Sequence, residues 1–458
     1  MNNSIALGGR VKDRPRAHRR TQTDAAAQDK PRAGLPWQAR FFLVSLLGPW
    51  IITVGSLTLT LQRVALLALA VPALMRWLRG DAGRISMPDK LFFGFCLWGT
   101  ICLFLSEGPS KVVQSGGILF LETFIPYLIA RCWIRSAEDF RRMFVFLLTL
   151  AAILLPMALF ETMTGTNAAA AFMRILPTYS LESNIVRAGF TRAQVVFEHP
   201  ILFGMFAASL LSGAWLVAGQ GHSTGQKFLL AALAAFLTLM SLSSAPVGAA
   251  VMQIGLVSWH FFTRAVTHRW ILLALLVGGA AFGASLMTSR SLAEVYITYF
   301  TFDPATGWYR INIWTYGSAS VWAHPLFGLG FGNWVHPLWM SDSIDNFWLV
   351  QAMRYGLPGV LMFGGGLVWQ TVAIGRRHFT DPKLTAYQTA FIATAFAFFA
   401  TGWTVHFWGG AYSYLLFLLG AGAWMIEAPL TPATEPPETG SASNRRSVSR
   451  RRQREATP

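Results

Sequence analysis

The chain has 458 residues, of which 53% are hydrophobic and only 13% are charged, and its net charge is +16. So low a charged fraction excludes an ordinary soluble multidomain enzyme and indicates a protein whose solvent is the lipid bilayer. The basic excess lies mainly in the two tails and in short loops, so we expect no nucleic-acid partner.

Twelve apolar stretches approach the roughly 20 residues that an α-helix needs to cross about 30 Å of hydrocarbon. In chain order they are 41–56, 58–76, 89–106, 112–131, 143–161, 200–218, 227–242, 246–263, 270–288, 347–374, 386–404 and 408–427. We therefore predict an all-α polytopic membrane protein with about 12 transmembrane helices. The runs 41–76 and 227–263 are almost continuous, so broken or re-entrant helices are the alternative there.

Lysine and arginine are distributed unevenly between the two sides that these spans define. Of the 37 such residues, 29 fall in the tails and loops of one side, six in the loops of the other, and two within spans. Because positively charged loops stay in the cytoplasm, this bias predicts a bacterial inner-membrane protein with both termini cytoplasmic.

The two ends of the chain predict disordered basic tails around a single membrane domain. Residues 1–40 and 428–458 are rich in Arg, Pro, Ser, Ala and Thr and have little apolar surface to bury. The transmembrane domain is expected over 41–427. No cleavage site follows the first apolar run, so we expect the first helix to stay in the mature chain.

Two segments on the non-cytoplasmic side are much longer than the other loops, namely 162–199 and 289–346. Loops of this length in a compact protein usually carry function or are disordered. The second is rich in aromatic side chains, which suits either stacking on sugar rings or a short amphipathic helix at the membrane surface. These side chains are Tyr296, Tyr299, Phe300, Phe302, Trp308, Tyr309, Trp314, Trp322, Trp334 and Trp339.

The arginines of these loops go against the charge bias. Arg187 and Arg192 precede the span that opens at Pro200, and Arg310 lies four residues before Trp314, which places both on one face if this segment is helical. A guanidinium group offers forked donors that fit phosphate oxygens. Pairing with nearby acids or with lipid headgroups is the alternative.

Four pieces in this part of the chain resemble the C-terminal signature of the O-antigen ligase and O-antigen polymerase superfamily. They are Arg310-Ile-Asn-Ile-Trp314, the turn His324-Pro-Leu-Phe-Gly-Leu-Gly-Phe-Gly332, Asp345-Asn-Phe-Trp-Leu349, and Tyr355-Gly-Leu-Pro-Gly359. The stretch 187–204 is similar to the other arginine-bearing loop of that family. The resemblance covers roughly 180–375 by motif and the whole chain by topology.

One residue departs from the family pattern and bears on whether the protein is a ligase or a polymerase. Asp345 stands where ligases of the family carry a His, which counts against a ligase and favours a polysaccharide polymerase. His336 lies nine residues earlier and could be a displaced counterpart. The glycine run 328–332 is not followed by the Lys-Ser/Thr of a nucleotide-binding loop, so we interpret it as a tight turn.

The resemblance implies polymerisation of polyprenyl-diphosphate-linked oligosaccharide repeat units at the periplasmic face, for exopolysaccharide or O-antigen synthesis. The transfer would invert the anomeric carbon and need neither a metal nor another cofactor. Arginines would stabilise the diphosphate leaving group, and a carboxylate or His would act as base. The candidates for this base are Asp345, Glu198, His199 and His336. Membrane lipid, a chain-length regulator and a flippase of the same pathway are the implied partners.

Each candidate has a simpler explanation. Asp345, Glu198 and His199 all stand next to expected helix starts, where capping alone would account for them. Arg354 lies about two turns inside a span and is either a substrate-binding residue or a cation that reaches back to the interface. His406 could be only an interface residue.

Two other functions are compatible with the sequence. One is a ligase that transfers glycan to lipid or protein, and the other is a transporter or flippase of lipid-linked glycan. A transporter should show repeats and charged, broken helices near the midplane, whereas these spans carry little central charge.

Overall fold

The computed structural model describes residues 34–55, 57–173, 177–178, 185–287, 294 and 304–430. This part of the chain is mostly helical, and nine of its helices are long and apolar enough to cross a membrane. They are α3 (Leu61–Leu78), α4 (Met87–Glu107), α5 (Pro109–Trp133), α6 (Ala137–Thr164), the run Pro200–Ala218 formed by α8 (Pro200–Ser209), α9 (Leu211–Gly213) and η1 (Ala214–Ala218), α11 (Ser244–Phe262), α15 (Phe347–Gly375), α16 (Pro382–Thr401), and Gly409–Glu427 formed by α17 (Gly409–Gly422) and α18 (Trp424–Glu427).

These nine helices coincide with nine of the twelve expected spans. The polytopic membrane architecture is therefore confirmed for the described residues. Two other expected spans form the apolar helices α10 (Thr224–Met240) and α12 (Arg269–Met287), which are not among the nine candidate membrane-spanning helices. Ser241–Ser243 separates α10 from α11. The run 227–263 therefore contains a break, which was one of the alternatives for it.

The first expected span, 41–56, is wrong. Helix α2 (Trp37–Ser45) is only nine residues long, and β1 (Ile51–Val54) and β2 (Leu57–Thr60) form an antiparallel hairpin before α3. Gly48 and Pro49 end the helical stretch, and the β-branched residues Ile51–Val54 favour an extended strand. Helix α2 also begins inside the range expected to be a tail; the rest of that tail and residues 431–458 lie outside the described residues.

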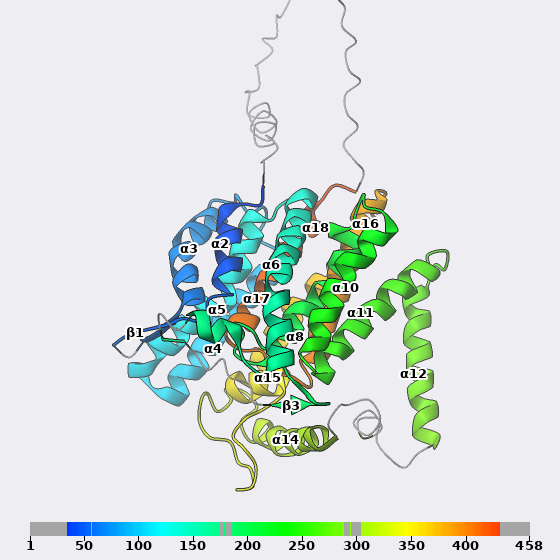
Figure 1. The fold of residues 1–458 in the computed structure, drawn as a ribbon. Coiled ribbons are helices and arrows are strands. Elements are labelled where there is room, and N and C mark those ends of the chain that lie inside the picture. The colour runs from blue at the N-terminus through cyan, green and yellow to red at the C-terminus, as the bar shows by residue number, and fades with distance from the viewer. Residues whose placement is uncertain are drawn as a thin grey trace, which may run out of the picture.

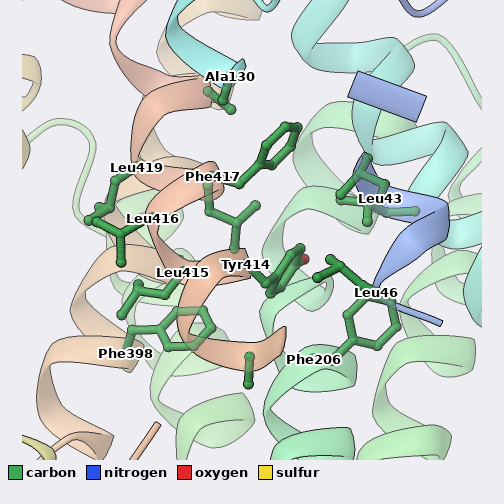
Figure 2. Close-up of a cluster of buried hydrophobic side chains, with 14 of the residues drawn as sticks. Leu43, Leu46, Ala130, Phe206, Phe398, Tyr414, Leu415, Leu416, Phe417 and Leu419 are labelled. Atoms are coloured by element: carbon green, nitrogen blue, oxygen red, sulfur yellow. The ribbon is translucent and has the colours of Figure 1, made fainter. Parts of the chain in front are cut away.

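Helix α17 lies at the centre of the bundle and packs most extensively on α5. A Cβ at Gly420 would collide with the Tyr127 carbonyl oxygen, so glycine permits this close approach. Figure 2 shows apolar side chains of α17 meeting residues from four other helices: Leu415, Leu416, Phe417 and Leu419 pack near Leu43 of α2, Ala130 of α5, Phe206 of α8 and Phe398 of α16.

The start of α2 and the end of α18 lie at one end of the molecule, and the surface helix α14 (Pro304–Ala323) lies at the other (Figure 1). At the first end, the buried Arg131 pairs with Glu427 at 3.1 Å and with Asp89 at 3.5 Å. This network ties α18 to α4 and α5.

The two long loops fall where the sequence places them. The first contains α7 (Ala168–Met173) and the two-stranded hairpin of β3 (Val186–Arg187) and β4 (Phe190–Thr191), and the second contains α14. Tyr296, Tyr299, Phe300 and Phe302 of the expected aromatic cluster lie outside the described residues. Helix α12 stands apart from the main bundle (Figure 1), and most of its side chains are exposed, as suits contact with lipid.

Candidate functional site

Helix α14 places Arg310 near the start of α15 and Trp314 near the end of α16. It packs along α15 through Ile313 and Val321, which belong to one cluster with Leu349 and Met353. The Arg310 Nη2 lies 3.9 Å from the Asp345 Oδ2, and the ring centroids of Trp314 and Trp403 are 5.8 Å apart. The segment around Arg310 and Trp314 is therefore helical, the condition under which the two share a face, and α15 and the loop after α16 are the elements it faces.

Asp345 does not cap α15. The cap is Asn346, whose Oδ1 accepts a hydrogen bond of 3.0 Å from the Leu349 N–H, so the capping explanation for Asp345 is wrong. Asp345 instead lies within ion-pair distance of Arg310, with 36% of its side chain exposed. Burial raises the pKa of its carboxyl, and the charges of Arg310 and Arg192 oppose that shift.

Arg187 ends β3 of the hairpin, and Arg192 directly follows β4. Ala188 and Gly189 form the hairpin turn with φ of +50° and +81°, the left-handed pair that a tight two-residue hairpin needs. The Arg192 Nε donates to the Ser241 carbonyl at 3.1 Å and its Nη2 to the Ser243 hydroxyl at 2.6 Å.

The Arg187 Nη1 donates to the carbonyl of Leu242 at 3.1 Å, a residue with the left-handed φ of +43°. Together with the bonds from Arg192, this contact braces the break between α10 and α11. The two arginines therefore hold the chain in place, in addition to any contact they make with a ligand.

Arg187, Arg192 and Arg310, here called the arginine cluster, come together from two loops more than a hundred residues apart. Burial lowers the pKa of Arg192 to about 10, with further lowering by the charges of Arg187 and Arg310, while Asp345 acts in the opposite direction. Arg192 therefore lies within electrostatic reach of both other arginines.

Two cavities adjoin near this cluster. The first, here called the Asp345 cavity, measures about 380 Å³ and includes Asp345 in its wall; the second, the Glu198 cavity, measures about 570 Å³ and includes Glu198. Both volumes are in the range of small-molecule sites, roughly 300–1,000 Å³. The cavities share four wall residues, Phe331, Arg354, His406 and Trp408.

Arg354 reaches both cavities because α15 is interrupted beside it. Gly356 has φ +68°, and a Cβ there would collide with the Leu326 carbonyl oxygen. The Leu329 N–H donates to the Met353 carbonyl at 2.6 Å and the Gly330 N–H to the Arg354 carbonyl at 3.2 Å. The glycine run is thus a tight turn, as expected, and it docks on the interruption of α15, with the Arg354 guanidinium 4.9 Å from the centre of the Phe331 ring.

Glu198 and His199 have different roles at the start of α8. The cap is His199, whose Nδ1 accepts from the Ile201 N–H at 3.1 Å. Burial, followed by the charges of Arg192 and Arg187, lowers the pKa of His199 to about 4, so its ring is neutral at neutral pH. Glu198 does not cap the helix and lines its cavity instead.

His336 is separated from these groups by its own contacts. Its Nε2 lies 2.9 Å from an Asp342 carboxylate oxygen, and its Nδ1 lies 3.0 Å from the Pro337 carbonyl oxygen. Both ring nitrogens thus face oxygen atoms of the protein. His336 is not among the described residues that line the two cavities.

Several residues that line the cavities were not predicted from the sequence as site residues. They are Gln351 of α15, Trp408 before α17, and the ion pair of Arg63 Nε with Glu122 Oε1 at 2.7 Å. A carboxylate inside the apolar run 112–131 was an available signal, because ionisable groups within spans are often functional. Gln351, Arg354 and Tyr355 also form a polar patch on one face of an apolar helix.

Comparison with known proteins gave no match, either to a family model or to a curated protein. The resemblance to the O-antigen ligase and polymerase superfamily therefore rests on the motifs alone.

Proposed function

We propose that this protein polymerises polyprenyl-diphosphate-linked oligosaccharide repeat units by inverting, metal-independent glycosyl transfer at the periplasmic face of the bacterial inner membrane. The observation that carries the proposal is the gathering of Arg187, Arg192 and Arg310 near Asp345, which lines one of two adjoining cavities. An arginine cluster at the end of a membrane bundle is suited to an anionic headgroup whose tail lies in the bilayer.

The arginine cluster stabilises the leaving group. As the bond between the anomeric carbon and the diphosphate oxygen breaks, negative charge develops on the diphosphate. Fixed guanidinium groups offset that charge without the rearrangement that water would need. The bonds from Arg187 and Arg192 to the α10–α11 break hold two of them in position before substrate binds.

A third cavity supports the proposed carrier lipid. It measures about 540 Å³, lies between α11 and α16, and its wall is formed mainly by small and apolar residues: Ser244, Ala245, Val247, Gly248, Ala249, Val251, Met252, Ala400, Thr401 and Thr404. It begins at Ser244, next to the Ser243 hydroxyl that accepts from Arg192. An isoprenoid chain in this groove would bring its diphosphate to the arginine cluster.

Deletion of the gene tests the proposal. We expect the mutant to accumulate single repeat units on the lipid carrier, detectable by mass spectrometry of extracted lipids. Accumulation of long glycan on the carrier would instead indicate a ligase, and an unchanged glycan profile would contradict any role in this pathway. A plasmid copy of the gene should restore the polymer.

A further inference from the structure

The wall of the Glu198 cavity has the chemistry of a saccharide site. It combines carboxylates and amides, which donate to or accept from hydroxyl groups, with the rings of Trp408, Tyr355 and Tyr412, on which the apolar faces of sugars pack. Two polar atoms in this wall, the Gln351 Oε1 and the His406 Nδ1, are buried and have no hydrogen-bond partner within the described part of the chain. Buried polar atoms are usually paired, so a ligand that supplies hydroxyl groups would complete them.

Glu198 differs from the other carboxylates of this cavity. Glu122 pairs with Arg63 at 2.7 Å and Glu107 with Lys111 at 3.6 Å, whereas none of the described ion pairs includes Glu198. Glycine at 409 leaves room for it, because a Cβ there would collide with the Glu198 Oε1. The Glu198 carboxylate is therefore available to a ligand in the cavity.

Glu198 and its neighbour His199 link the Glu198 cavity to the arginine cluster. His199 is within electrostatic reach of Arg187 and Arg192, and Glu198 is within reach of Arg63 and Glu122 of the cavity wall. A group bound in the Glu198 cavity would thus approach a diphosphate on the arginine cluster from the side of Glu198.

We infer that the Glu198 cavity binds the acceptor saccharide and that the Glu198 carboxylate takes the proton of its attacking hydroxyl. The inference rests on the proposed function. The hydroxyl O–H bond breaks and its proton passes to Glu198, the oxygen forms the new bond to the anomeric carbon, and the electron pair of the old glycosyl bond leaves with the diphosphate. Asp345 then acts as a positioning residue for Arg310 rather than as the base.

The ionisation of Glu198 suits this role. Burial raises its pKa to about 7, Glu122 adds to the rise, and the hydrogen bond from Trp408 and the charge of Arg63 oppose it. A base whose pKa is near the working pH is close to optimal. The charged and titratable groups that line the cavity with Glu198 come from every element around it: Arg63 of α3, Glu107 of α4, Lys111 and Glu122 of α5, Arg354 and Tyr355 of α15, His406 before α17, and Tyr412 of α17.

The first test compares Glu198→Gln with Glu198→Asp in purified protein, using lipid-linked repeat units isolated from the deletion strain. We expect Glu198→Gln to lower kcat on the order of 10²-fold or more, and Glu198→Asp to recover part of the loss. In the wild type the rate should rise with pH through about 7, as Glu198 loses its proton, and this limb should vanish in Glu198→Gln. Glu138→Gln, at the opposite end of the bundle, is the matched control. A Glu198→Gln enzyme with the wild-type rate and pH profile would overturn the assignment.

The second test measures binding and does not need turnover. The probe is the repeat-unit oligosaccharide released from its lipid, and binding is followed by tryptophan fluorescence. We expect Gln351→Leu to weaken binding about tenfold, the scale of one lost hydrogen bond, and the control Glu138→Gln to leave it unchanged. Failure of the wild type to bind this probe would overturn the acceptor site even if polymer forms. Binding without polymer would instead refute the proposed function.

Discussion

Arg310 and Arg192 belong to one cluster but differ in their surroundings. Arg310 lies on a surface helix within ion-pair distance of Asp345, whereas Arg192 is 3% exposed and bonded to the α10–α11 break. The first is suited to contact substrate, and the second also supports the fold. Substitution should separate these two contributions.

We expect Arg310→Ala to abolish polymer while the protein level stays near normal, because the leaving group loses a guanidinium, whereas Asp345, which loses its ion-pair partner, is 36% exposed and can be solvated by water. Arg310→Lys should rescue poorly, since an ammonium is a point charge where a planar fork is needed. Polymer is measured on gels and protein by immunoblot. Arg192→Ala is the contrasting variant: loss of its donors to two buried acceptors should destabilise the protein by about 1–3 kcal/mol per group and lower its amount. Full-length polymer from Arg310→Ala would remove this residue from the site.

Asp345 and Asn346 provide a second contrast between neighbours. Asp345→Asn should lower kcat about tenfold, because Arg310 loses a charged partner, without removing the limb of the pH profile assigned to Glu198. Asn346→Ala should instead cost about 1 kcal/mol of stability, since it removes the cap of α15. Steady-state kinetics and thermal unfolding of the purified variants give both quantities. A loss of 10²-fold or more in Asp345→Asn would return the role of base to Asp345.

At the scale of elements, the interruptions of helices place the site. Leu242, with positive φ, lies in the break after α10, where Arg187 and Arg192 bind. Gly356, also with positive φ, interrupts α15 where the glycine turn docks. An unbroken helix has no free carbonyl groups in its interior to accept such bonds, whereas a break exposes them. Each break therefore anchors one loop of the site to the bundle.

Gly356→Ala tests the second anchor. The left-handed conformation costs a residue with a Cβ about 1–2 kcal/mol, and the collision with the Leu326 carbonyl adds to this. We expect a lower apparent Tm and a loss of activity through displacement of Arg354. Gly365→Ala, on the same helix in ordinary helical conformation with only Leu91 nearby at 3.9 Å, is the control and should be neutral or stabilising. Equal Tm values for the two variants would contradict this account of the break.

At the scale of the whole molecule, the end that carries α14 is opposite the end where α2 starts and α18 finishes (Figure 1). The proposed function requires the first end to face the periplasm. Reporter fusions at Ser318 should therefore behave as periplasmic, and fusions at Gly83 and Ser136 as cytoplasmic, in agreement with the distribution of Lys and Arg. Phosphatase and fluorescence reporters measure this directly. A cytoplasmic signal at Ser318 would place the arginine cluster in the wrong compartment and refute the proposal.

The sequence by itself determined the class of fold and most of the helices. Hydropathy is a local property, because each span must meet the bilayer with its own side chains, so nine spans and both long loops could be located without tertiary information. The prediction from hydropathy failed at 41–56, where an apolar run forms a short helix and a hairpin. Hydropathy does not distinguish a helix from buried or interfacial strands.

The site was decided mainly by the tertiary structure. The sequence identified Arg187, Arg192, Arg310, Asp345 and Glu198 singly, but their proximity depends on contacts between loops more than a hundred residues apart. Tertiary packing also made Asn346 the cap instead of Asp345, gave His336 its own partner, and brought Gln351 and His406 to the wall beside Glu198. Such contacts follow from how the helices pack, which no local pattern of residues specifies.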